Sequence, residues 1–402
     1  MNVLFVNACN YGSTGNMVNS LCELLKSEGA NCLAAFPKTK ENKNHFKEGQ
    51  FLFGNKFSRN LSSRFCSLFG NHKGLFFYDT YCLLRTIKRF KPDIIHLHNL
   101  HGNYLNIRCL FSYINKNHIP VVWTFHDCWP FTGRCPHFII IGCEKWKSGC
   151  YECPYPKKEY PAAMVDKTKQ QWKKKKRFFT SVDNLTVVTP SKWLSRLVGL
   201  SFFKDKKIQT INNGIDLNVF KPKESNFRCK NHLENKIIVL GVAFDWGYKK
   251  GLDVFIELAS ALPKQYQIVL VGTNEAVDEQ LPLNIISIHK TSNKSELAEL
   301  YSSADVFFNP TREENYPTVN MEAIACGTPV VTFETGGSPE IVTDKTGIVI
   351  KSNSVDESVA AIRECCEKHL FKKEDCLERA KNFNEKERFK EYLNLYKNIE
   401  KR

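Results

Sequence analysis

No run of apolar residues in this sequence approaches the ~18 residues that a membrane-spanning helix needs. The N-terminus reads Met1-Asn-Val-Leu-Phe-Val-Asn-Ala and the first basic residue is Lys26, whereas a signal peptide begins with basic residues. We therefore expect a cytoplasmic protein, with any membrane association peripheral and on the inner face of the cytoplasmic membrane. In that compartment most of the 16 cysteines should be reduced thiols.

Several familiar ligand-binding patterns are also missing. No Asp-x-Asp pair occurs, so a divalent metal that holds a diphosphate is not implied, and we expect catalysis to require no cofactor. The glycine-containing turn after the first apolar run has the spacing of neither a dinucleotide fingerprint nor a Walker loop. These absences remove the two commonest nucleotide-binding classes.

Acidic residues are outnumbered by basic ones, and the net charge is +15. Such a charge favours nucleic acid, anionic lipid or an anionic substrate without choosing among them. No recognised nucleic-acid-binding module accompanies it, so we expect no nucleic-acid partner and keep a basic nucleic-acid-binding protein as a distant alternative.

Strand-like apolar runs alternate with segments of helical period, which is typical of α/β domains with parallel sheets. A chain of 402 residues exceeds the size at which one core keeps growing, so two Rossmann-like domains are predicted. Region 38–74 is predicted to be a loop with a short helix, and the polar segment 218–235 is predicted to link the domains. The predicted strands are 2–7, 32–36, 93–98, 121–125, 185–189, 207–211, 236–242, 267–271, 284–289, 306–309, 329–333 and 347–350.

Two carboxylates, Glu314 and Glu322, flank Pro317 in a segment that reads Glu-Asn-Tyr-Pro-Thr-Val-Asn-Met-Glu. Proline suits the first turn of a helix, so we predict Glu314 on a loop and Glu322 two turns into a helix. A rise of about 1.5 Å per residue separates them by roughly 10 Å, about the span from the sugar to the ribose of a nucleotide sugar. The free amides near Thr318 and Val319 form a helix N-terminus that suits a diphosphate. For the spacing alone, two solvated glutamates are the simpler interpretation.

This segment resembles the paired-glutamate signature of the family-4 retaining glycosyltransferases, as found in bacterial capsule, exopolysaccharide and O-antigen synthesis. The resemblance implies the GT-B fold, in which two Rossmann-like domains with parallel sheets face a central cleft. It also implies that Glu314 binds sugar hydroxyls and supports oxocarbenium character, and that Glu322 accepts the ribose hydroxyls. The adjoining donor-binding candidates are Asn315, Tyr316, Pro317, Thr318 and Val319.

The same resemblance assigns a role to each domain. Residues 1–217 would form an acceptor-binding domain, with an irregular Cys-rich insertion at about 129–160, and residues 218–384 a nucleotide-sugar-binding domain. The last helix, 385–402, carries an apolar stripe and would pack back on the first domain. The stripe consists of Phe389, Tyr392, Leu393 and Tyr396.

A turn with Gly12, Ser13 and Gly15 joins the first predicted strand to a helix. Glycine lets a backbone approach a ligand closely, but a strand–turn–helix connection needs glycine and a capping residue in any case. The turn is similar to the family-4 loop beneath the donor diphosphate. That similarity makes the three residues donor-binding candidates.

Histidines lie just beyond the carboxyl ends of predicted parallel strands, where open α/β sheets bind ligands. The Thr-Phe-His-Asp segment that ends in His126 and Asp127 is similar to the family's active-site turn, whose histidine faces the donor sugar. His126 is therefore a catalytic candidate. His98, His101 and Asp127 are acceptor-side candidates, and His289 is a donor-binding candidate.

Lys249 and Lys250 precede Gly251 at the predicted start of a helix. In the family, a lysine at this point and an arginine about five residues earlier both grip the diphosphate. Here the arginine position is Asp245, so either Lys249 supplies the second positive charge or Lys250 and backbone amides hold the diphosphate alone. Both lysines are donor-binding candidates, and Lys250 is also a catalytic candidate; solvated surface charge is the alternative.

The insertion contains four cysteines and ends in Cys-x-x-Cys. Four reduced thiols within a polar loop could bind one structural Zn²⁺ tetrahedrally, although only one half of the cluster has tight spacing. Ordinary thiols are the alternative. The four are Cys135, Cys143, Cys150 and Cys153.

A basic run with aromatic edges spans Trp172 to Phe179. Its functional interpretation is contact with an anionic membrane surface, because each Lys or Arg near such a surface contributes about 1 kcal/mol. A solvated helix face is the alternative.

We therefore expect a retaining glycosyltransferase that moves a sugar from a nucleotide-diphosphate sugar to a lipid-linked saccharide acceptor in bacterial surface polysaccharide synthesis. A nucleotide-sugar epimerase or hydrolase on the same fold is the alternative. It would form free sugar or epimer at the same rate without an acceptor.

Overall fold

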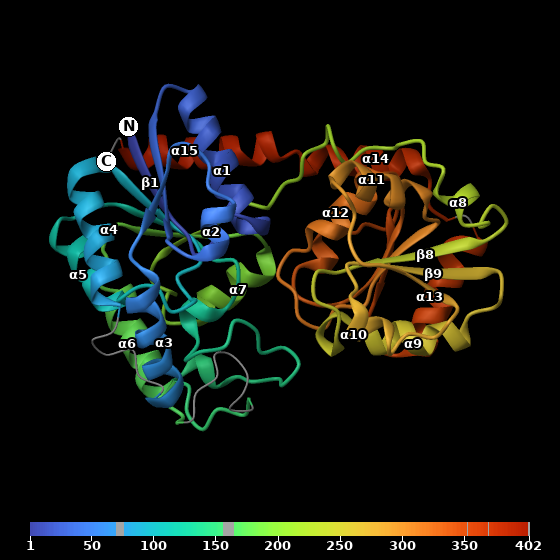
Figure 1. Ribbon diagram of the computed structural model, residues 1–402, viewed down its shortest axis with the longest axis horizontal. Coiled ribbons are helices and arrows are strands. Elements are labelled where there is room, and N and C mark those ends of the chain that lie inside the picture. Colours follow the sequence, from blue (N-terminus) through green and yellow to red (C-terminus); the bar gives the residue numbers. More distant parts are fainter. Residues whose placement is uncertain (70–75, 156–164, 352, 369, 401–402) are drawn as a thin grey trace. The chain divides into compact units, whose positions relative to one another are not determined.

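The computed structural model describes residues 1–69, 76–155, 165–351, 353–368 and 370–400 (Figure 1). The chain forms two compact units. The N-terminal unit comprises Met1–Ile211 and Phe389–Arg402, and the C-terminal unit comprises Asn212–Arg388. The chain thus first leaves the N-terminal unit a few residues before position 217, where the sequence analysis ends the first domain.

The N-terminal unit is built on a parallel sheet of order β3-β2-β1-β4-β5-β6-β7. Its central strands are apolar and fully buried because helices cover both faces of such a sheet. The strands are β1 Asn2–Val6, β2 Asn31–Pro37, β3 Gln50–Phe53, β4 Ile94–Leu97, β5 Val121–Thr124, β6 Leu185–Thr189 and β7 Lys207–Thr210. The helices are α1 Gly12–Ser27, α2 Lys40–Asn44, α3 Lys56–Phe69, α4 Phe77–Phe90, α5 Ile107–Lys116, α6 Thr168–Phe179 and α7 Lys192–Leu200, with 3₁₀ turns η1 Trp129–Phe131 and η2 Lys145–Lys147.

The C-terminal unit has a second parallel sheet, of order β10-β9-β8-β11-β12-β13. The strands are β8 Ile237–Val242, β9 Tyr266–Val271, β10 Ile285–Ile288, β11 Val306–Asn309, β12 Val330–Phe333 and β13 Gly347–Ile350. The helices are α8 Phe227–Lys230, α9 Leu252–Ala261, α10 Glu275–Asp278, α11 Lys294–Ser303, α12 Thr318–Ala325, α13 Val355–Glu367 and α14 Lys373–Ala380, with 3₁₀ turns η3 Tyr248–Lys250, η4 Ser338–Glu340 and η5 Lys381–Phe383.

The last helix, α15 (Glu385–Glu400), packs its apolar stripe into the core of the N-terminal unit. The hydroxyl of Tyr396 lies 2.6 Å from Nδ1 of the buried His96, and the hydroxyl of Tyr392 lies 3.2 Å from Oγ1 of Thr124. The helix that follows the C-terminal unit is therefore part of the N-terminal unit's core.

Two expectations about the irregular regions are wrong. Region 38–74 was expected to be a loop with a short helix, yet its described part contains α2, β3 and α3, because the short strand β3 pairs with β2. Segment 218–235 was expected to be a linker. It belongs to the C-terminal unit, since Phe220 and Leu233 are in its core and Arg228 is 2.5 Å from Asp305.

The cysteines divide into one disulfide and free thiols. Cys22 of α1 and Cys32 of β2 form the disulfide, which the sequence analysis did not predict. The remaining cysteines whose side chains are described are free thiols.

Among the described residues, every helix is too short or too polar to traverse a bilayer.

Candidate active site

Lys250 and Glu314 form an ion pair at the carboxyl edge of the C-terminal sheet. Lys250 ends η3, which follows β8, and Glu314 lies in the loop that joins β11 to α12. β8 and β11 are neighbours in the sheet, so their carboxyl ends bring the two loops together. Nζ of Lys250 donates a hydrogen bond of 2.8 Å to Oε2 of Glu314. Two of the predicted catalytic residues are therefore in direct contact.

The helix that follows, α12, begins with a free N-terminus. Pro317 occupies the N-cap position in an extended conformation and makes no side-chain capping bond. The first N–H groups of a helix have no acceptor within it, so those of Thr318 and Val319 are available to an anion. The predicted donor-binding amides are thus at the start of an uncapped helix.

Glu322 lies little more than one turn into α12, not two turns as the sequence analysis expected, because the helix begins only at Thr318. The hydroxyl of the buried Tyr301 donates a 3.1 Å hydrogen bond to Oε2 of Glu322. Burial raises the pKa of Glu322 to about 7, against the opposing effect of its hydrogen bonds with Tyr301 and Thr318. This carboxyl group therefore changes charge near neutral pH.

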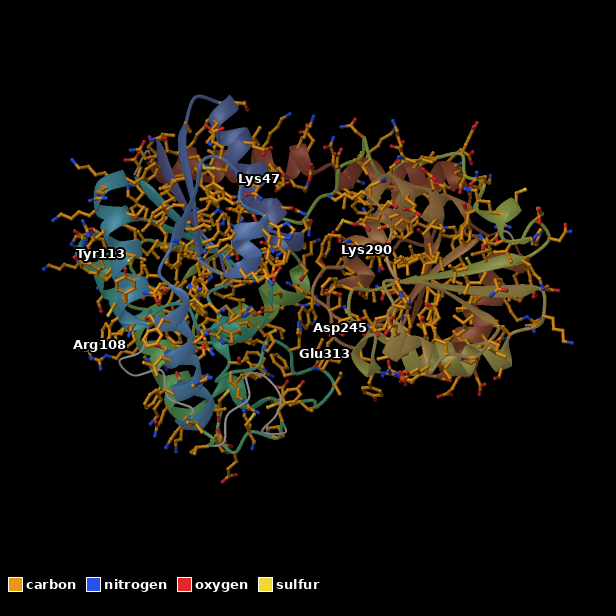
Figure 2. The ribbon with its side chains drawn as sticks, viewed as in Figure 1. Lys47, Arg108, Tyr113, Asp245, Lys290 and Glu313 are labelled. Atoms are coloured by element: carbon orange, nitrogen blue, oxygen red, sulfur yellow. A yellow bond between two sulfur atoms is a disulfide. The ribbon has the colours of Figure 1, made fainter. Side chains whose placement is uncertain are left out.

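Lys249 lies beside a different carboxylate. Its Nζ is 3.9 Å from Oε2 of Glu313, whose side chain is almost fully buried. Asp245, which replaces the arginine expected from the resemblance, is exposed in the loop after β8; Figure 2 labels it together with Glu313. Each of the two lysines thus faces a carboxylate of the β11–α12 loop.

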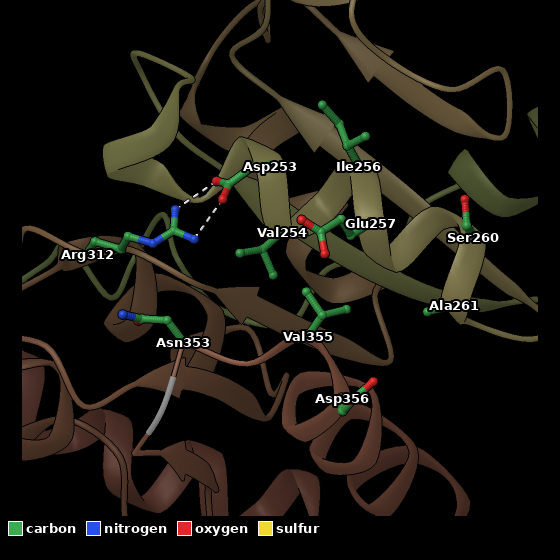
Figure 3. A pocket seen from close by; sticks show the side chains of 10 residues that line it. All are labelled: Asp253, Val254, Ile256, Glu257, Ser260, Ala261, Arg312, Asn353, Val355 and Asp356. Carbon is green, nitrogen blue, oxygen red and sulfur yellow. Dashed lines mark hydrogen bonds and ion pairs between the residues drawn. The ribbon is translucent and has the colours of Figure 1, made fainter.

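Arg312 holds these two loops in place, and it is not among the residues predicted from the motifs. Its guanidinium group binds the carboxylate of Asp253 through two hydrogen bonds of 2.7 Å (Figure 3). It also donates a 2.6 Å bond to the carbonyl of Tyr248 and lies 4.1 Å from the centre of that ring. Because Tyr248 begins η3, Arg312 fixes the turn that carries Lys250. The only sequence feature that could have pointed to Arg312 is its position two residues before Glu314.

A groove of about 770 Å³ lies beside the Arg312–Asp253 pair. Figure 3 shows the side chains that line it. It is lined mainly by α9 and the start of α13, and Lys250, Glu314 and Glu322 are not among its lining residues. This groove is therefore separate from the residues that the motifs single out.

Gly336 lies directly against the backbone of Glu314. Its φ is +59°, and a Cβ added there would be 2.0 Å from the carbonyl oxygen of Glu314. Next to it, the N–H of Gly337 donates a 2.8 Å bond to the carbonyl of Asn315. Only glycine fits this position, and the loop after β12 supports the loop that carries Glu314.

The remaining donor-binding candidates of this unit differ in position. Tyr316 is buried in the hydrophobic core, where burial raises its pKa to about 12, and Asn315 is only 4% exposed. Both therefore support the loop from within. His289 follows the edge strand β10, and its Nε2 lies 2.5 Å from Oδ2 of Asp278. Because β9 lies between β10 and β8 in the sheet, His289 is separated from the loop that carries Lys250.

In the N-terminal unit, Gly12 and Ser13 are exposed at the start of α1. Gly12 has a φ of +68° with open space around its Cα, and the N-cap residue makes no side-chain capping bond. Gly15 is different. A Cβ there would be 2.5 Å from the backbone of Asn10, so packing alone requires this glycine.

His98 and His126 form one cluster after the neighbouring strands β4 and β5. Nδ1 of His98 is 2.9 Å from Nε2 of His126, and the rings stack with their centres 5.2 Å apart. Burial lowers the pKa of His126 to about 4 and that of His98 well below its usual value. Both imidazoles are therefore neutral at pH 7, and the catalytic role expected for His126 stays a prediction.

A second pair adjoins this cluster. Nε2 of His101 is 2.9 Å from Oδ2 of Asp127, and Oδ1 of Asp127 accepts a bond from the N–H of Trp129. Burial alone would lower the pKa of His101, but the charge of Asp127 outweighs it and raises the pKa. The four residues predicted from the two histidine motifs thus come together, and among the three histidines only His101 has a raised pKa.

The four cysteines of the insertion line one small cavity of about 20 Å³. The N–H of Gly133 donates a 3.1 Å bond to Sγ of Cys150, and burial raises the thiol pKa of Cys150 to about 11 and that of Cys135 to about 12. In the ranges that the structure describes, no three metal-ligating side chains are arranged around a single ion position. The thiol set suits zinc by its chemistry, but the zinc site stays a prediction.

A buried lysine fastens the same insertion. Nζ of Lys175 donates bonds to the carbonyls of Trp129 (2.7 Å) and Thr132 (3.1 Å) and lies 3.5 Å from the centre of the Trp129 ring. Burial lowers its pKa to about 7. Helix α6 is therefore part of the support of the cysteine segment.

Two family models together cover most of the chain. The model described as Glycosyltransferase Family 4 matches residues 15–219, and the one described as Glycosyl transferases group 1 matches residues 222–388. The chain belongs to glycosyltransferase family 4. It is a glycosyltransferase, and the resemblance found in its motifs is confirmed.

Individual relatives agree with this assignment. The putative colanic acid biosynthesis glycosyl transferase WcaC of Escherichia coli (strain K12) is 26% identical over 344 residues, which are 83% of this chain and 81% of that protein. The N,N'-diacetylbacillosaminyl-diphospho-undecaprenol alpha-1,3-N-acetylgalactosaminyltransferase of Campylobacter jejuni is 27% identical over 210 residues, 49% of this chain and 56% of that protein.

Solved structures show the same fold. Sucrose-phosphate synthase from Thermosynechococcus elongatus has a TM-score of 0.74 at 18% identity, over 99% of this chain and 98% of that one. Anabaena HepE in complex with UDP-glucose has a TM-score of 0.68 at 15% identity, over 99% of this chain and 100% of that one. The predicted GT-B fold of the glycosyltransferase is therefore confirmed.

Replacing Gly336 by alanine tests the support of the Glu314 loop. Because the new Cβ would collide with a backbone carbonyl at a positive φ, we expect Gly336→Ala to lower the free energy of unfolding by about 2–4 kcal/mol. Urea unfolding measures this. Gly199→Ala, in α7 with nothing within 4 Å of the added Cβ, is the control and should be neutral or slightly stabilising. Equal stability of the two variants would contradict the contact.

Metal analysis tests the cysteine cluster. If the four thiols bind zinc, protein purified without chelator contains one zinc per chain, and the Cys150→Ser/Cys153→Ser variant loses it, because two of the four thiolate ligands are gone. Zinc-free wild-type protein would show that these are ordinary thiols. Cys229→Ser, an exposed thiol in the C-terminal unit, is the control.

Proposed function

We propose that the protein is a retaining glycosyltransferase that transfers a sugar from a nucleoside-diphosphate sugar to a lipid-linked saccharide acceptor during assembly of a bacterial surface polysaccharide. The observation that carries the proposal is the 2.8 Å ion pair between Lys250 and Glu314, in a loop that leads into the uncapped helix α12. A cation, a carboxylate and a helix N-terminus in this order suit a sugar joined to a diphosphate.

The transfer breaks the bond between the anomeric carbon and the β-phosphate oxygen. The electron pair leaves with the nucleoside diphosphate. The oxygen of the acceptor hydroxyl forms the new bond to the anomeric carbon, and its proton passes to the leaving diphosphate. Negative charge grows on the leaving phosphate, so prearranged donors at that oxygen contribute most to catalysis. We assign Lys250 and the N–H groups of Thr318 and Val319 as the hydrogen-bond donors to this leaving phosphate.

Each of the two glutamates is assigned to one part of the nucleotide sugar. Glu314, which already accepts a bond from Lys250, would bind sugar hydroxyls and stabilise positive charge at the anomeric carbon. Glu322, at the end of the first turn of α12, would accept hydrogen bonds from the ribose. Arg312 acts as a positioning residue because it braces the turn of Lys250.

The acceptor and donor classes rest on the relatives. The name of the Campylobacter jejuni relative specifies a diphospho-undecaprenol acceptor, WcaC is named for colanic acid, and HepE binds UDP-glucose. A lipid-linked saccharide and a nucleotide sugar are the corresponding classes here. A thermal-shift panel of UDP-, GDP- and ADP-sugars identifies the base and the sugar.

Variants of the two glutamates test the site. We expect Glu314→Gln to lower kcat by roughly a hundredfold, as for a misplaced catalytic group, and Glu322→Ala to raise the Kd of the donor about tenfold. Glu364→Gln is the matched control, because it breaks an exposed Lys–Glu pair of 3.0 Å on α13. Kinetics with the donor selected by the panel, and titration calorimetry, measure both effects. Unchanged values in both variants would remove the assignment.

The products distinguish transfer from its alternatives. With a radiolabelled donor, we expect label to appear in the lipid fraction only when lipid-linked acceptor is present. Free sugar or epimer formed at an equal rate without acceptor would instead identify a hydrolase or an epimerase.

Donor affinity should depend on pH through Glu322. Because its pKa is raised to about 7, the carboxyl group is mostly protonated at about pH 6 and mostly ionised at about pH 8, where it accepts ribose hydroxyls. We expect the Kd of the donor to fall roughly tenfold between these values. Glu322→Gln should abolish this dependence. A variant that keeps the wild-type pH profile would show that another group is responsible.

A further inference from the structure

Helix α3, labelled at the lower left of Figure 1, carries a stripe of large apolar side chains that are exposed. The four residues recur at intervals of four, four and three, so they lie on one face of the helix. A soluble helix normally turns such a face toward the core. The stripe consists of Phe57, Leu61, Phe65 and Leu68, which are 80%, 51%, 47% and 49% exposed.

The opposite face of α3 is polar and points inward. Arg59 and Ser62 are buried, and Nη1 of Arg59 lies 3.5 Å from Oδ1 of the buried Asp79 in α4. Oγ of Ser58 donates a 3.1 Å bond to the same carboxylate, and Oγ of Ser62 accepts the N–H of Phe76. The helix is thus anchored by its polar face, which leaves its apolar face toward solvent.

Helix α4, which contacts α3, also exposes large aromatic side chains. Phe77, Tyr78 and Tyr81 are each more than half exposed in its first turns. Farther along, Arg85, Lys88 and Arg89 are exposed, and the guanidinium of Arg85 is 5.8 Å from the Tyr81 ring. Aromatic residues followed by basic ones are typical of a segment that lies at the boundary between lipid tails and headgroups.

The charge of this surface has one sign. Helix α3 contains no Asp or Glu, and the single acid of α4, Asp79, is buried. The exposed charged residues of the two helices are therefore all basic: Lys56, Arg64, Arg85, Lys88 and Arg89.

We propose that α3 and the first turns of α4 form a docking surface for an anionic lipid bilayer, with the apolar stripe inserted among the lipids and the basic residues at the headgroups. The area of exposed apolar residues supports insertion, and the uniform positive charge favours anionic lipid over a neutral surface. The docking surface does not depend on the proposed reaction.

This surface replaces the one that the sequence analysis selected. The aromatic residues that edge the basic run of α6 are largely taken up by the core: Trp172 is 6% exposed, Phe179 is fully buried, and Phe178 is partly buried and packed against the core. Lys175, in the middle of the run, is buried as well. The α6 segment therefore lacks the apolar residues that insertion requires.

Vesicle co-sedimentation of the full chain tests the proposal. We expect the protein to bind vesicles of phosphatidylcholine with phosphatidylglycerol, to bind phosphatidylcholine alone weakly, and to be released by high salt. Phe57→Ser/Leu61→Ser should lower the partition coefficient at least about tenfold, since two inserted side chains are lost. Phe244→Ser/Leu283→Ser is the matched control: it removes a Phe and a Leu that are 99% and 107% exposed in the C-terminal unit, and it should bind as the wild type does.

Three results would overturn the proposal. One is absence of binding to anionic vesicles, and another is an equal loss in the control variant. The third is a wild-type dimer in solution that Phe57→Ser/Leu61→Ser dissociates, which would make the stripe an interface between copies of this chain. A second test does not require the serine variants to fold equally well. The tryptophan fluorescence of the Phe57→Trp variant should shift to shorter wavelength on anionic vesicles, and an unshifted spectrum would equally refute insertion.

Discussion

All strands of a parallel sheet end at the same edge, and this constraint decides where the chemistry of the protein can be. In the C-terminal unit, β8 and β11 are neighbours, so the loops after them bring Lys250 within 2.8 Å of Glu314 although 64 positions separate them. In the N-terminal unit, β4 and β5 do the same for His98 and His126. Each cluster follows from strand order more than from local sequence.

Burial then gives similar side chains different charges. Glu314 is partly exposed and paired with a cation, whereas burial in α12 brings the pKa of Glu322 to about 7. His98 and His126 are neutral because they are buried together, while Asp127 raises the pKa of His101. A carboxyl group that is half ionised near pH 7 suits reversible binding of a ribose, and a paired one suits a constant electrostatic role. The environment, not the residue type, separates these roles.

The sequence predicted the fold and the family because strands, turns and motifs are local patterns. Apolar runs marked the strands, and residues placed just after them came together at the sheet edges. Arg312 was missed because its role depends on Asp253, 59 positions away. The sequence did not indicate that Tyr316, beside Glu314, is part of the hydrophobic core, because its neighbours there are distant in sequence. The position of Glu322 was wrong because Pro317 is the N-cap of α12, so the helix starts later.

Helix α3 shows a limit of pattern-based prediction that has a physical origin. An amphipathic period indicates that a helix has an apolar and a polar face, and the usual inference is that the apolar face packs against the core. Here the buried carboxylate of Asp79 requires partners, and Arg59 and Ser58 supply them from the polar face of α3. An unpaired buried charge costs more than the exposure of a few apolar side chains, so Asp79 decides which face turns inward. The apolar residues Phe57, Leu61, Phe65 and Leu68 therefore stay partly exposed to solvent.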